Sequence, residues 1–356
     1  MSETVDGIHI RPAGLLHGEA AHHALRCGLA LPLAGGPSAF STAEILHRCA
    51  ATGEISRRWV AARDLAALAE KQPPLAARLE RITRSRPTVT GLDFSRPRIM
   101  GIVNVTPDSF SDGGRHADAP SAVAHALTLV EQGADILDVG GESTRPGAAE
   151  VPVEEEIARV VPVVRELAQR GLTVSVDTRK AAVMEAAITA GAAIINDVTA
   201  LREDPRAAGV VAEAGVPVIL MHARELPVRP DVTHVYEDVV LDVADALESH
   251  VRNAMRAGIP EGNIIVDPGL GFGKDTDDNL RLMHRLTLFH GLGVPLLVGA
   301  SRKRFIGAVT GVEAPAERLA GSLAVAQLAV QAGAAIVRVH DVAETAQMVR
   351  MLLSAW

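Results

Sequence analysis

The feature that most limits the possible folds is an alternation that begins at Arg98 and continues to the C-terminus. Short aliphatic runs of four to six residues alternate with longer amphipathic segments. Each run has the length and composition of a strand buried on both faces, and each longer segment has those of a covering helix. The alternation therefore predicts an α/β fold built around a parallel sheet.

Eight strand–helix pairs can be counted in this region. The expected strands lie at 98–103, 135–139, 173–177, 193–196, 217–221, 263–267, 295–298 and 335–339. The expected helices lie at 120–133, 152–170, 179–190, 204–214, 236–257, 277–289, 315–333 and 341–353. Eight pairs over about 260 residues match the usual size of a (β/α)8 TIM barrel. A doubly wound open sheet is the main alternative, because a local pattern does not reveal whether a sheet closes on itself.

The first 97 residues have a different composition, rich in Ala, Arg, His and Pro. They show one expected helix, at about 59–84, and little strand character. We therefore expect two parts: an N-terminal accessory segment of unknown role at 1–97 and the barrel at 98–356. A chain that begins near Leu92 would keep the whole barrel, so residues 1–97 are expected to be dispensable for the chemistry.

Several classes of protein fit this chain poorly. No stretch approaches the roughly 18 charge-free residues of a membrane span, and the N-terminus lacks the pattern of a signal peptide, so we expect a soluble, cytoplasmic protein. The formal net charge of −8 argues against a sequence-independent grip on nucleic acid, which needs clustered cations. Cys27 and Cys49 lack the spacing of a zinc site or a disulfide framework and are expected to be free thiols.

Polar residues mark the carboxyl ends of nearly all the expected strands. They are Asn104, Asp138, Asp177, Asn196, Asp197, His222, Asp267, Lys303, Arg338 and His340. A barrel carries its active site on the face where its strands end, so these residues together predict a polar pocket. Each residue alone has a simpler explanation, because Asp or Asn at a strand end commonly caps the next helix. In pairs such as Asp177-Thr178 and Asn196-Asp197, one member can cap while the other faces a ligand.

The donors and acceptors in this set indicate the class of ligand. Asp177, Asn196 and Asp267 offer carboxylate and amide groups that suit a flat heterocycle with an amino-pyrimidinone edge. Lys303 and Arg338 add positive charge, and the planar guanidinium suits phosphate or stacking on a ring. The pocket is therefore expected to bind an aromatic heterocycle beside an anion.

Two Gly-rich stretches follow expected strands. The first, DPGLGFGK at 267–274, lacks the glycine spacing of both common nucleotide-binding loops, so its glycines are expected to let the backbone bend or approach a ligand. The second, DSFSDGG at 108–114, is small and polar, as a mobile active-site loop would be. An ordinary surface loop explains the second stretch equally well when it is considered alone.

Taken in order, these motifs resemble one known family. The matching segments are NVTPDSFSDGG at 104–114, GGESTRPGA at 140–148, SVDTRK at 175–180, IIND at 194–197, LMH at 220–222, DPGLGFGK at 267–274, GASRKRFIG at 299–307 and RVHDV at 338–342. The family is the dihydropteroate synthases, and the resemblance covers about 98–356. It implies a transferase of folate biosynthesis that joins 6-hydroxymethyl-7,8-dihydropterin pyrophosphate to p-aminobenzoate and releases pyrophosphate.

The resemblance also implies roles for individual residues. The pterin would be bound by Asp177, Asn196, Asp267 and Lys303. The pyrophosphate would lie by Asn104, Thr144, Arg338 and His340, with Mg²⁺ near Asn104. The p-aminobenzoate site would include Phe110, Pro146 and Lys303, and the catalytic residues would be Asp112, Lys303 and Arg338. The family resemblance further implies a homodimer.

Two other kinds of protein would use the same pterin-binding residues. A pterin-binding methyltransferase barrel would not need the two loops at 104–114 and 140–148, and both are present. A non-catalytic paralogue would have lost leaving-group or loop residues, and none of those residues is missing. One departure lies after Met221-His222, where many family members have a Gly-containing turn and this chain has Ala223 to Pro227. This loop is expected to differ in shape without affecting catalysis.

Overall fold

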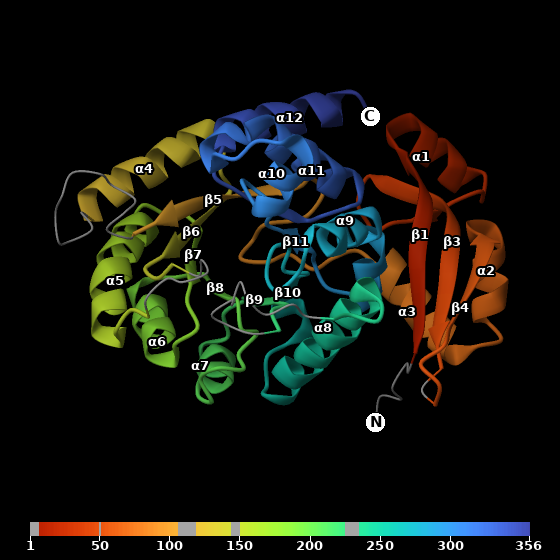
Figure 1. Cartoon of the computed structure of the whole chain (residues 1–356), viewed down its shortest axis with the longest axis horizontal. Coiled ribbons are helices and arrows are strands. Elements are labelled where there is room, and N and C mark those ends of the chain that lie inside the picture. Colours follow the sequence, from red (N-terminus) through yellow and green to blue (C-terminus); the bar gives the residue numbers. More distant parts are fainter. Residues whose placement is uncertain (1–6, 50, 106–118, 144–149, 225–234) are drawn as a thin grey trace.

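The computed structural model describes residues 7–49, 51–105, 119–143, 150–224 and 235–356. The expected strands of the C-terminal part form one parallel sheet of eight strands (Figure 1) in the order β10-β9-β8-β7-β6-β5-β12-β11. The two ends of that sheet meet, because Val266 in β10 pairs in parallel with Leu296, immediately before β11. The sheet is therefore closed into a (β/α)8 barrel, and the doubly wound alternative is excluded.

The observed strands start and end within two residues of the expected ones. They are β5 Arg98–Asn104, β6 Ile136–Gly140, β7 Val174–Asp177, β8 Ile194–Asp197, β9 Val218–Met221, β10 Ile264–Asp267, β11 Leu297–Val298 and β12 Ile336–Val339. The covering helices are α4 Ala119–Gln132, α5 Val153–Gln169, α6 Ala181–Ala190, α7 Ala207–Ala214, α8 Val239–Arg256, α9 Thr276–His284, α11 Leu319–Gln331 and α12 Val342–Ser354.

Between β11 and α11 the chain forms a short helix that the sequence pattern did not predict. This helix, α10 Arg304–Thr310, ends at Gly311, which has a left-handed φ of 76°. The expected helix at 277–289 is also shorter than predicted, because α9 is followed by a 3₁₀ helix, η3 Leu286–Leu292. Two further 3₁₀ turns, η2 Glu261–Asn263 and η4 Pro315–Glu317, precede β10 and α11.

The N-terminal part is an antiparallel sheet with helices, so the expectation of little strand character there is wrong. The central strand β3 Ser38–Arg48 pairs with β1 Ile8–His17 on one side and with β2 Leu31–Pro32 and β4 Ile55–Ala61 on the other. Pairing of β1 with β3 joins segments far apart in sequence and rich in Ala and His, which have weak local strand signals. The sheet therefore depends on cross-strand pairing and burial, which local periodicity does not reveal.

The single helix expected at 59–84 is also wrong. Its first residues belong to β4, and the rest divides into α2 Ala62–Ala69 and α3 Pro73–Thr83; a separate helix, α1 Gly18–Arg26, follows β1. The break comes before Pro73 and Pro74, because proline has no N–H with which to continue a preceding helix but fits the first turn of a new one. We call residues 7–83 the N-terminal unit.

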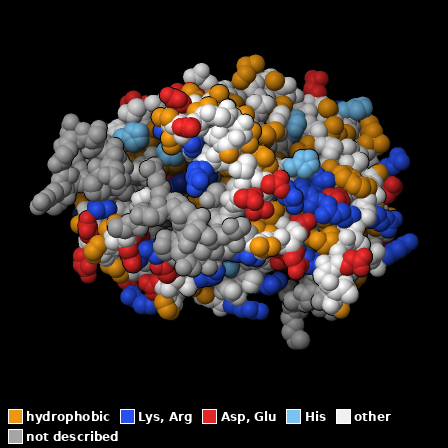
Figure 2. Space-filling view, in the orientation of Figure 1, with side chains coloured by type: hydrophobic (Ala, Val, Ile, Leu, Met, Phe, Trp, Pro, Cys, Tyr) orange, Lys and Arg blue, Asp and Glu red, His pale blue; other side chains and the backbone are white. Residues whose placement is uncertain are grey.

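The N-terminal unit packs beside the barrel against α8 and η3, and basic side chains gather on it where it meets the barrel (Figures 1 and 2). Arg78 in α3 is the largest side chain buried in this contact, with 2% of its surface exposed. Its guanidinium donates to Glu248 of α8 at 3.0 Å and to the Gly291 carbonyl of η3 at 2.8 Å. One buried cation therefore joins the unit to two elements of the barrel.

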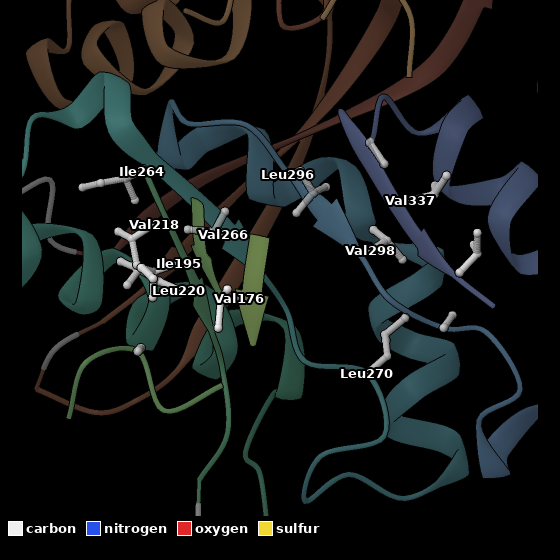
Figure 3. Packing of buried hydrophobic residues seen from close by; sticks show 14 of the residues in the cluster. Val176, Ile195, Val218, Leu220, Ile264, Val266, Leu270, Leu296, Val298 and Val337 are labelled. Atoms are coloured by element: carbon white, nitrogen blue, oxygen red, sulfur yellow. The ribbon is translucent and has the colours of Figure 1, made fainter. Parts of the chain in front are cut away.

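Apolar side chains cover both faces of the barrel strands. Along β8 to β10, Ile194, Ile219 and Ile265 point into the barrel interior. Their neighbours Ile195, Val218, Leu220, Ile264 and Val266 pack outward against the helices (Figure 3). Burial on both sides explains why these strands appear in the sequence as continuous aliphatic runs rather than alternating ones.

A short segment before β5 packs with the interior of the barrel. Val89, Leu92 and Phe94 contact the same cluster as Met100 and Ile136, near the starts of the strands. Val89 is 2% exposed and forms an isolated antiparallel bridge with Leu92. These residues precede the expected boundary at 97, so the apolar packing of the barrel extends upstream of it.

Within the described residues, Cys27 and Cys49 are free, as expected. In the same part of the chain, no helix has both the length and the apolar character that crossing a bilayer would require.

We expect the Arg78→Met substitution to lower the free energy of unfolding by about 3 kcal/mol, because it removes one of the two cations that pair with Glu248 and leaves the Gly291 carbonyl without its donor. Urea unfolding monitored by circular dichroism measures this change. The matched control is Arg63→Met in α2, since the side chain of Arg63 is 63% exposed. Equal stability of the two variants would show that the buried cation does not join the unit to the barrel.

Candidate active site

Polar side chains from neighbouring strands stand at one level at the carboxyl end of the barrel. The strand register pairs Asn104 with Gly140, Gly140 with Asp177, and Asp177 with Asn196. Three of the residues expected to bind substrate therefore lie side by side along this edge. Asp267 ends β10 in the same way, paired with Met221 of β9.

Arg338 of β12 links two carboxylates across the barrel mouth. Its Nε donates to Asp138 at 2.6 Å, and its Nη2 donates to Asp177 at 2.9 Å. Burial alone would lower the pKa of this guanidinium, but Asp138 and Asp177 outweigh that effect and raise it. Arg338 is therefore a fixed positive charge with 22% of its side chain exposed at the mouth.

Asp138 was expected among the polar residues of the pocket but was given no role, although it forms the base of this cluster. Its side chain is fully buried within β6, where Oδ2 also accepts a hydrogen bond from Asn196 Nδ2 at 3.0 Å. Its other oxygen, Oδ1, has no partner among the described residues. The available signal was a single carboxylate inside an otherwise apolar strand, and such a group needs a buried partner.

The carboxyl group of Asp177 is poised between its charged and neutral forms. Burial is the main cause of its shift and, together with the nearby carboxylates Asp138 and Asp197, raises its pKa to about 7 despite the opposing charge of Arg338. A strongly perturbed carboxyl group beside a cation in a barrel mouth is typical of a binding or catalytic site. A ligand that donates hydrogen bonds would favour the charged form of Asp177.

Asp267 and Lys303 form the other side of the mouth. Asp267 is 5% exposed and accepts a hydrogen bond from the Gly269 N–H at 2.7 Å, and burial raises its pKa. The Lys303 ammonium donates to the Leu270 carbonyl and lies 4.7 Å from the centre of the Phe272 ring. Burial lowers the pKa of Lys303 to about 8, although Asp267 partly opposes the shift.

The Gly-rich segment after β10 bends tightly around the end of β9, as its composition predicted. Gly269 has a left-handed φ of 67°, and a Cβ there would lie 1.9 Å from the His222 carbonyl oxygen. A Cβ on Gly271 would lie 3.0 Å from the Lys303 side chain. Only glycine, which has no Cβ, lets the backbone lie this close to His222 at position 269 and to Lys303 at position 271.

Lys274 holds this segment in place, a role that sequence reasoning missed. Its ammonium donates to the carbonyls of Gly269 at 2.8 Å and Phe272 at 3.0 Å and lies 3.0 Å from His222 Nδ1. Burial lowers the pKa of Lys274 to about 7, and burial with the nearby Lys274 charge lowers that of His222 to about 2. The lowered pKa favours neutral His222, whose Nδ1 can accept a hydrogen bond from Lys274.

Neither strand-end pair caps the helix that follows, so this part of the expectation is wrong: α6 and α7 begin after Lys180 and Arg206, without a side-chain hydrogen bond at either cap. Asp197 accepts hydrogen bonds from the backbone of Thr199 and Leu201 in the turn that follows, while Asn196 reaches Asp138. Thr178 donates to the buried Glu156, and its neighbour Asp177 faces Arg338. In each pair, one residue bonds to the surrounding structure, Asp197 to the backbone of the next turn and Thr178 to Glu156, and the other faces the mouth.

On the side expected to bind pyrophosphate, Ser301 Oγ lies 3.0 Å from His340 Nδ1 and accepts the His340 backbone N–H at 3.2 Å. The structure thus places His340 next to the loop that carries Lys303. Asn104 is half-buried at the end of β5 and lies at the same end of the barrel. The expected residues Phe110, Asp112, Thr144 and Pro146 lie outside the described residues.

The donor set at Asn104 is compatible with Mg²⁺ only if other ligands join it. In the described residues, no group of three or more His, Cys, Asp or Glu side chains could hold a metal ion. Asn104 supplies one amide oxygen, and Mg²⁺ in proteins usually takes its remaining ligands from water and substrate phosphates. The residues present therefore fit a metal ion that binds together with a pyrophosphate group.

Comparison with known proteins matches the barrel and leaves the N-terminal unit outside. The family model described as pterin binding enzyme matches residues 100–340. A probable bifunctional folylpolyglutamate synthase/dihydropteroate synthase of Haloferax volcanii is 52% identical over 257 residues, which is 72% of this chain but 30% of that protein. The dihydropteroate synthase of Escherichia coli is 49% identical over 264 residues, covering 74% of this chain and 93% of that enzyme.

Solved structures of the Xanthomonas albilineans dihydropteroate synthase have the same barrel. The structure with 4-aminobenzoic acid superimposes with a TM-score of 0.71 at 51% identity and covers 76% of this chain and 97% of that one. The complex with 7,8-dihydropteroate gives a TM-score of 0.68 at 50% identity and covers 74% of this chain and 95% of that one. With the family model and the close relatives, this likeness shows that the chain belongs to the pterin-binding enzymes and, among them, to the dihydropteroate synthases.

Proposed function

We propose that the pterin binds between the two buried carboxylates of the barrel mouth, Asp177 and Asp267, with Asn196 and Lys303 completing its contacts. The chain is a dihydropteroate synthase, a transferase that condenses 6-hydroxymethyl-7,8-dihydropterin pyrophosphate with p-aminobenzoate in folate biosynthesis. The observation that supports this binding mode most strongly is the placement of both carboxyl groups at strand ends in the mouth, where burial also raises their pKa. Each group becomes a strong acceptor when the N–H donors of an amino-pyrimidinone edge replace the missing solvent.

In the reaction, the bond between the pterin methylene carbon and the pyrophosphate oxygen breaks, and the arylamine nitrogen forms a new bond to that carbon and loses a proton. The leaving pyrophosphate takes the electrons of the broken bond. Arg338 and His340, with Asn104 and Thr144, are proposed to bind this anion, and Arg338 is supported by its position as a fixed cation at the mouth. The carboxylates Asp177 and Asp267 would stabilise positive charge that develops on the pterin.

Mg²⁺ is proposed as the cofactor, with Asn104 as its ligand from this chain. When bound, the ion would neutralise charge on the leaving pyrophosphate. The donor set supports this proposal, because one amide oxygen suits an ion whose other ligands come from water and phosphate.

The p-aminobenzoate is proposed to lie on the outer side of the pterin, against Lys303. The ammonium of Lys303 already lies near an aromatic ring, that of Phe272. Phe110 and Pro146 would form other walls, and Asp112 would act catalytically; these roles rest on the motifs at 104–114 and 140–148. Glu142, near the start of the second motif, accepts the Val151 N–H at 2.8 Å and pairs with Arg179 at 3.1 Å.

A homodimer and a cytoplasmic location are proposed as well. Helices α11 and α12 pack together and expose the apolar side chains of Leu328 and Met351, with relative exposures of 55% and 70%. Apolar side chains exposed on neighbouring helices support an interface with a second copy. The free thiols of Cys27 and Cys49 support a reducing compartment.

We expect the full-length chain, with Mg²⁺ present, to form 7,8-dihydropteroate from the dihydropterin pyrophosphate and p-aminobenzoate. We expect the Asp267→Asn variant to lose most of this activity. The amide offers one acceptor where the carboxylate offers two, which costs about 1.5–3 kcal/mol of pterin binding. Calorimetry with the pterin substrate measures the loss, and Asp277→Asn on the exposed face of α9 is the control. Unchanged pterin affinity in folded Asp267→Asn would remove Asp267 from the site.

Pterin affinity is expected to peak between pH 7 and pH 8. Asp177 must be ionised to accept pterin N–H groups, so affinity falls as the pH drops through its pKa of about 7. Lys303 must be charged to donate, so affinity falls as the pH rises through its pKa of about 8. Calorimetry from about pH 5.5 to 9 gives the profile, in which Asp177→Asn should lack the acid limb. A profile without an acid limb in the unmodified protein would contradict this assignment.

A further inference from the structure

One face of α8 carries a row of acidic side chains that the barrel chemistry does not use. They are spaced three or four residues apart, which places them on one side of a helix: Asp238, Asp242, Asp245 and Glu248. Basic groups of the N-terminal unit meet each of them. The contacts are Arg57–Asp238 at 3.1 Å, Arg48–Asp242 at 2.6 Å, His9–Asp245 at 2.9 Å and Arg81–Glu248 at 2.9 Å.

A buried carboxylate of the N-terminal unit strengthens this contact at the Asp238 end of the acidic row. Glu44 in β3 is 3% exposed and accepts a hydrogen bond from Arg11 at 2.7 Å. It also pairs with Arg285, which immediately precedes η3, at 3.3 Å. Arg285 in turn lies 3.4 Å from Asp238, so Glu44 reaches Asp238 by a second route. A buried carboxylate with several partners is costly to disrupt, which makes this a rigid junction.

Asp238 uses its two oxygens for two different tasks. Oδ1 caps α8 by accepting the N–H groups of Val240 at 3.1 Å and Leu241 at 3.2 Å. Oδ2 accepts hydrogen bonds from Arg57 at 3.1 Å and Arg285 at 3.4 Å. The side chain that starts α8 is thus fixed in direction by the N-terminal unit.

Two residues before Asp238, Tyr236 reaches the pterin side of the barrel mouth. Its hydroxyl donates to the Gly273 carbonyl at 3.2 Å, and its ring centre is 6.3 Å from that of His222. Gly273 lies between Phe272, whose ring faces Lys303, and Lys274, which holds the Gly-rich segment in place. The route therefore runs from Arg57 to Asp238, along two backbone residues to Tyr236, and by its hydrogen bond to the segment that carries the pterin-side contacts.

We propose that the N-terminal unit is a positioning element of the pterin site, which acts through Arg57 and Glu44 on Asp238 and from there through Tyr236 on the Gly-rich segment 269–274. This proposal rests on the pterin-binding role given to the neighbouring Asp267 and Lys303. It opposes the sequence-based expectation that residues 1–97 are dispensable for the chemistry. A chain that begins near Leu92 would lack both Arg57 and Glu44 and would leave Asp238 and Arg285 without these partners.

The first test reverses one charge and uses the next residue of the same strand as the control. Arg57→Glu places a carboxylate beside Asp238 and Glu44, and should raise KM for 6-hydroxymethyl-7,8-dihydropterin pyrophosphate about fivefold with little change in kcat. Arg58 points to the opposite face of β4 and pairs with no described residue, so Arg58→Glu should leave KM unchanged. Arg57→Lys keeps the charge and should restore most of the affinity.

The second test asks whether the effect passes through Tyr236. Tyr236→Phe removes only the hydrogen bond to Gly273, and should raise the same KM. If both variants interrupt one route, their double variant should show an effect well below the product of the two single effects. The dissociation constant of the same pterin substrate, measured by calorimetry without p-aminobenzoate, should change in parallel. This measurement remains informative even if the unmodified chain makes no dihydropteroate, a result that would reject the assigned activity instead.

Two results would overturn the proposal. If Arg57→Glu lowers the melting temperature but leaves both KM and pterin affinity unchanged, the unit only stabilises the fold. If Arg57→Glu and Tyr236→Phe act independently, with fully multiplicative effects on pterin affinity, then the N-terminal unit does not act through Tyr236.

Discussion

The burial of opposite charges at the barrel mouth is the constraint on which the rest of this site depends. Asp138, Asp177 and Arg338 lie on three different strands, and their 2.6 and 2.9 Å contacts depend on the strand order β7-β6-β5-β12, which places Arg338 two strands from Asp138 and three from Asp177. Such a cluster is expensive to desolvate, and a substrate that brings its own donors and a negative charge can repay part of that cost. The strand order of the barrel therefore determines which charged side chains meet the pterin and its pyrophosphate.

Much of this arrangement could be predicted from the sequence, because it depends on the local pattern of apolar and polar residues. Strand positions follow from aliphatic runs, and a strand's last residue faces the mouth in any barrel. Asp177, Asn196 and Asp267 could therefore be named in advance, and the structure places them at that edge. Asp138 could be named as part of the pocket but not given a role, because its importance depends on the approach of Arg338 from a strand 200 residues away. Lys274 was missed for a similar reason, since its partners are backbone carbonyls of a bend that has no signature beyond its glycines.

The structure of the N-terminal unit, in contrast, could not be predicted from local sequence pattern. Its sheet joins β1 to β3 through long-range pairing, and its residues lack the β-branched runs that identify the barrel strands. The one local clue to its docking is the acidic row on α8, from Asp238 to Glu248, which would otherwise appear to be a solvated helix face. Only the positions of Arg48, Arg57 and Arg78 show that these acids are an interface. The matching family model begins at residue 100 and does not include this unit, so its role has to be inferred from these contacts.

The most direct test of the central claim is the titration of Asp177 itself. Carbon-13 NMR of the aspartate carboxyl groups, assigned by the signal lost in Asp177→Asn, gives the pKa in the free protein and with the pterin substrate bound. The account predicts a pKa near 7 in the free protein, because burial and neighbouring carboxylates outweigh Arg338, and a clear decrease when pterin N–H groups stabilise the carboxylate. An ordinary pKa near 4 in the free protein, unchanged by the pterin, would contradict it.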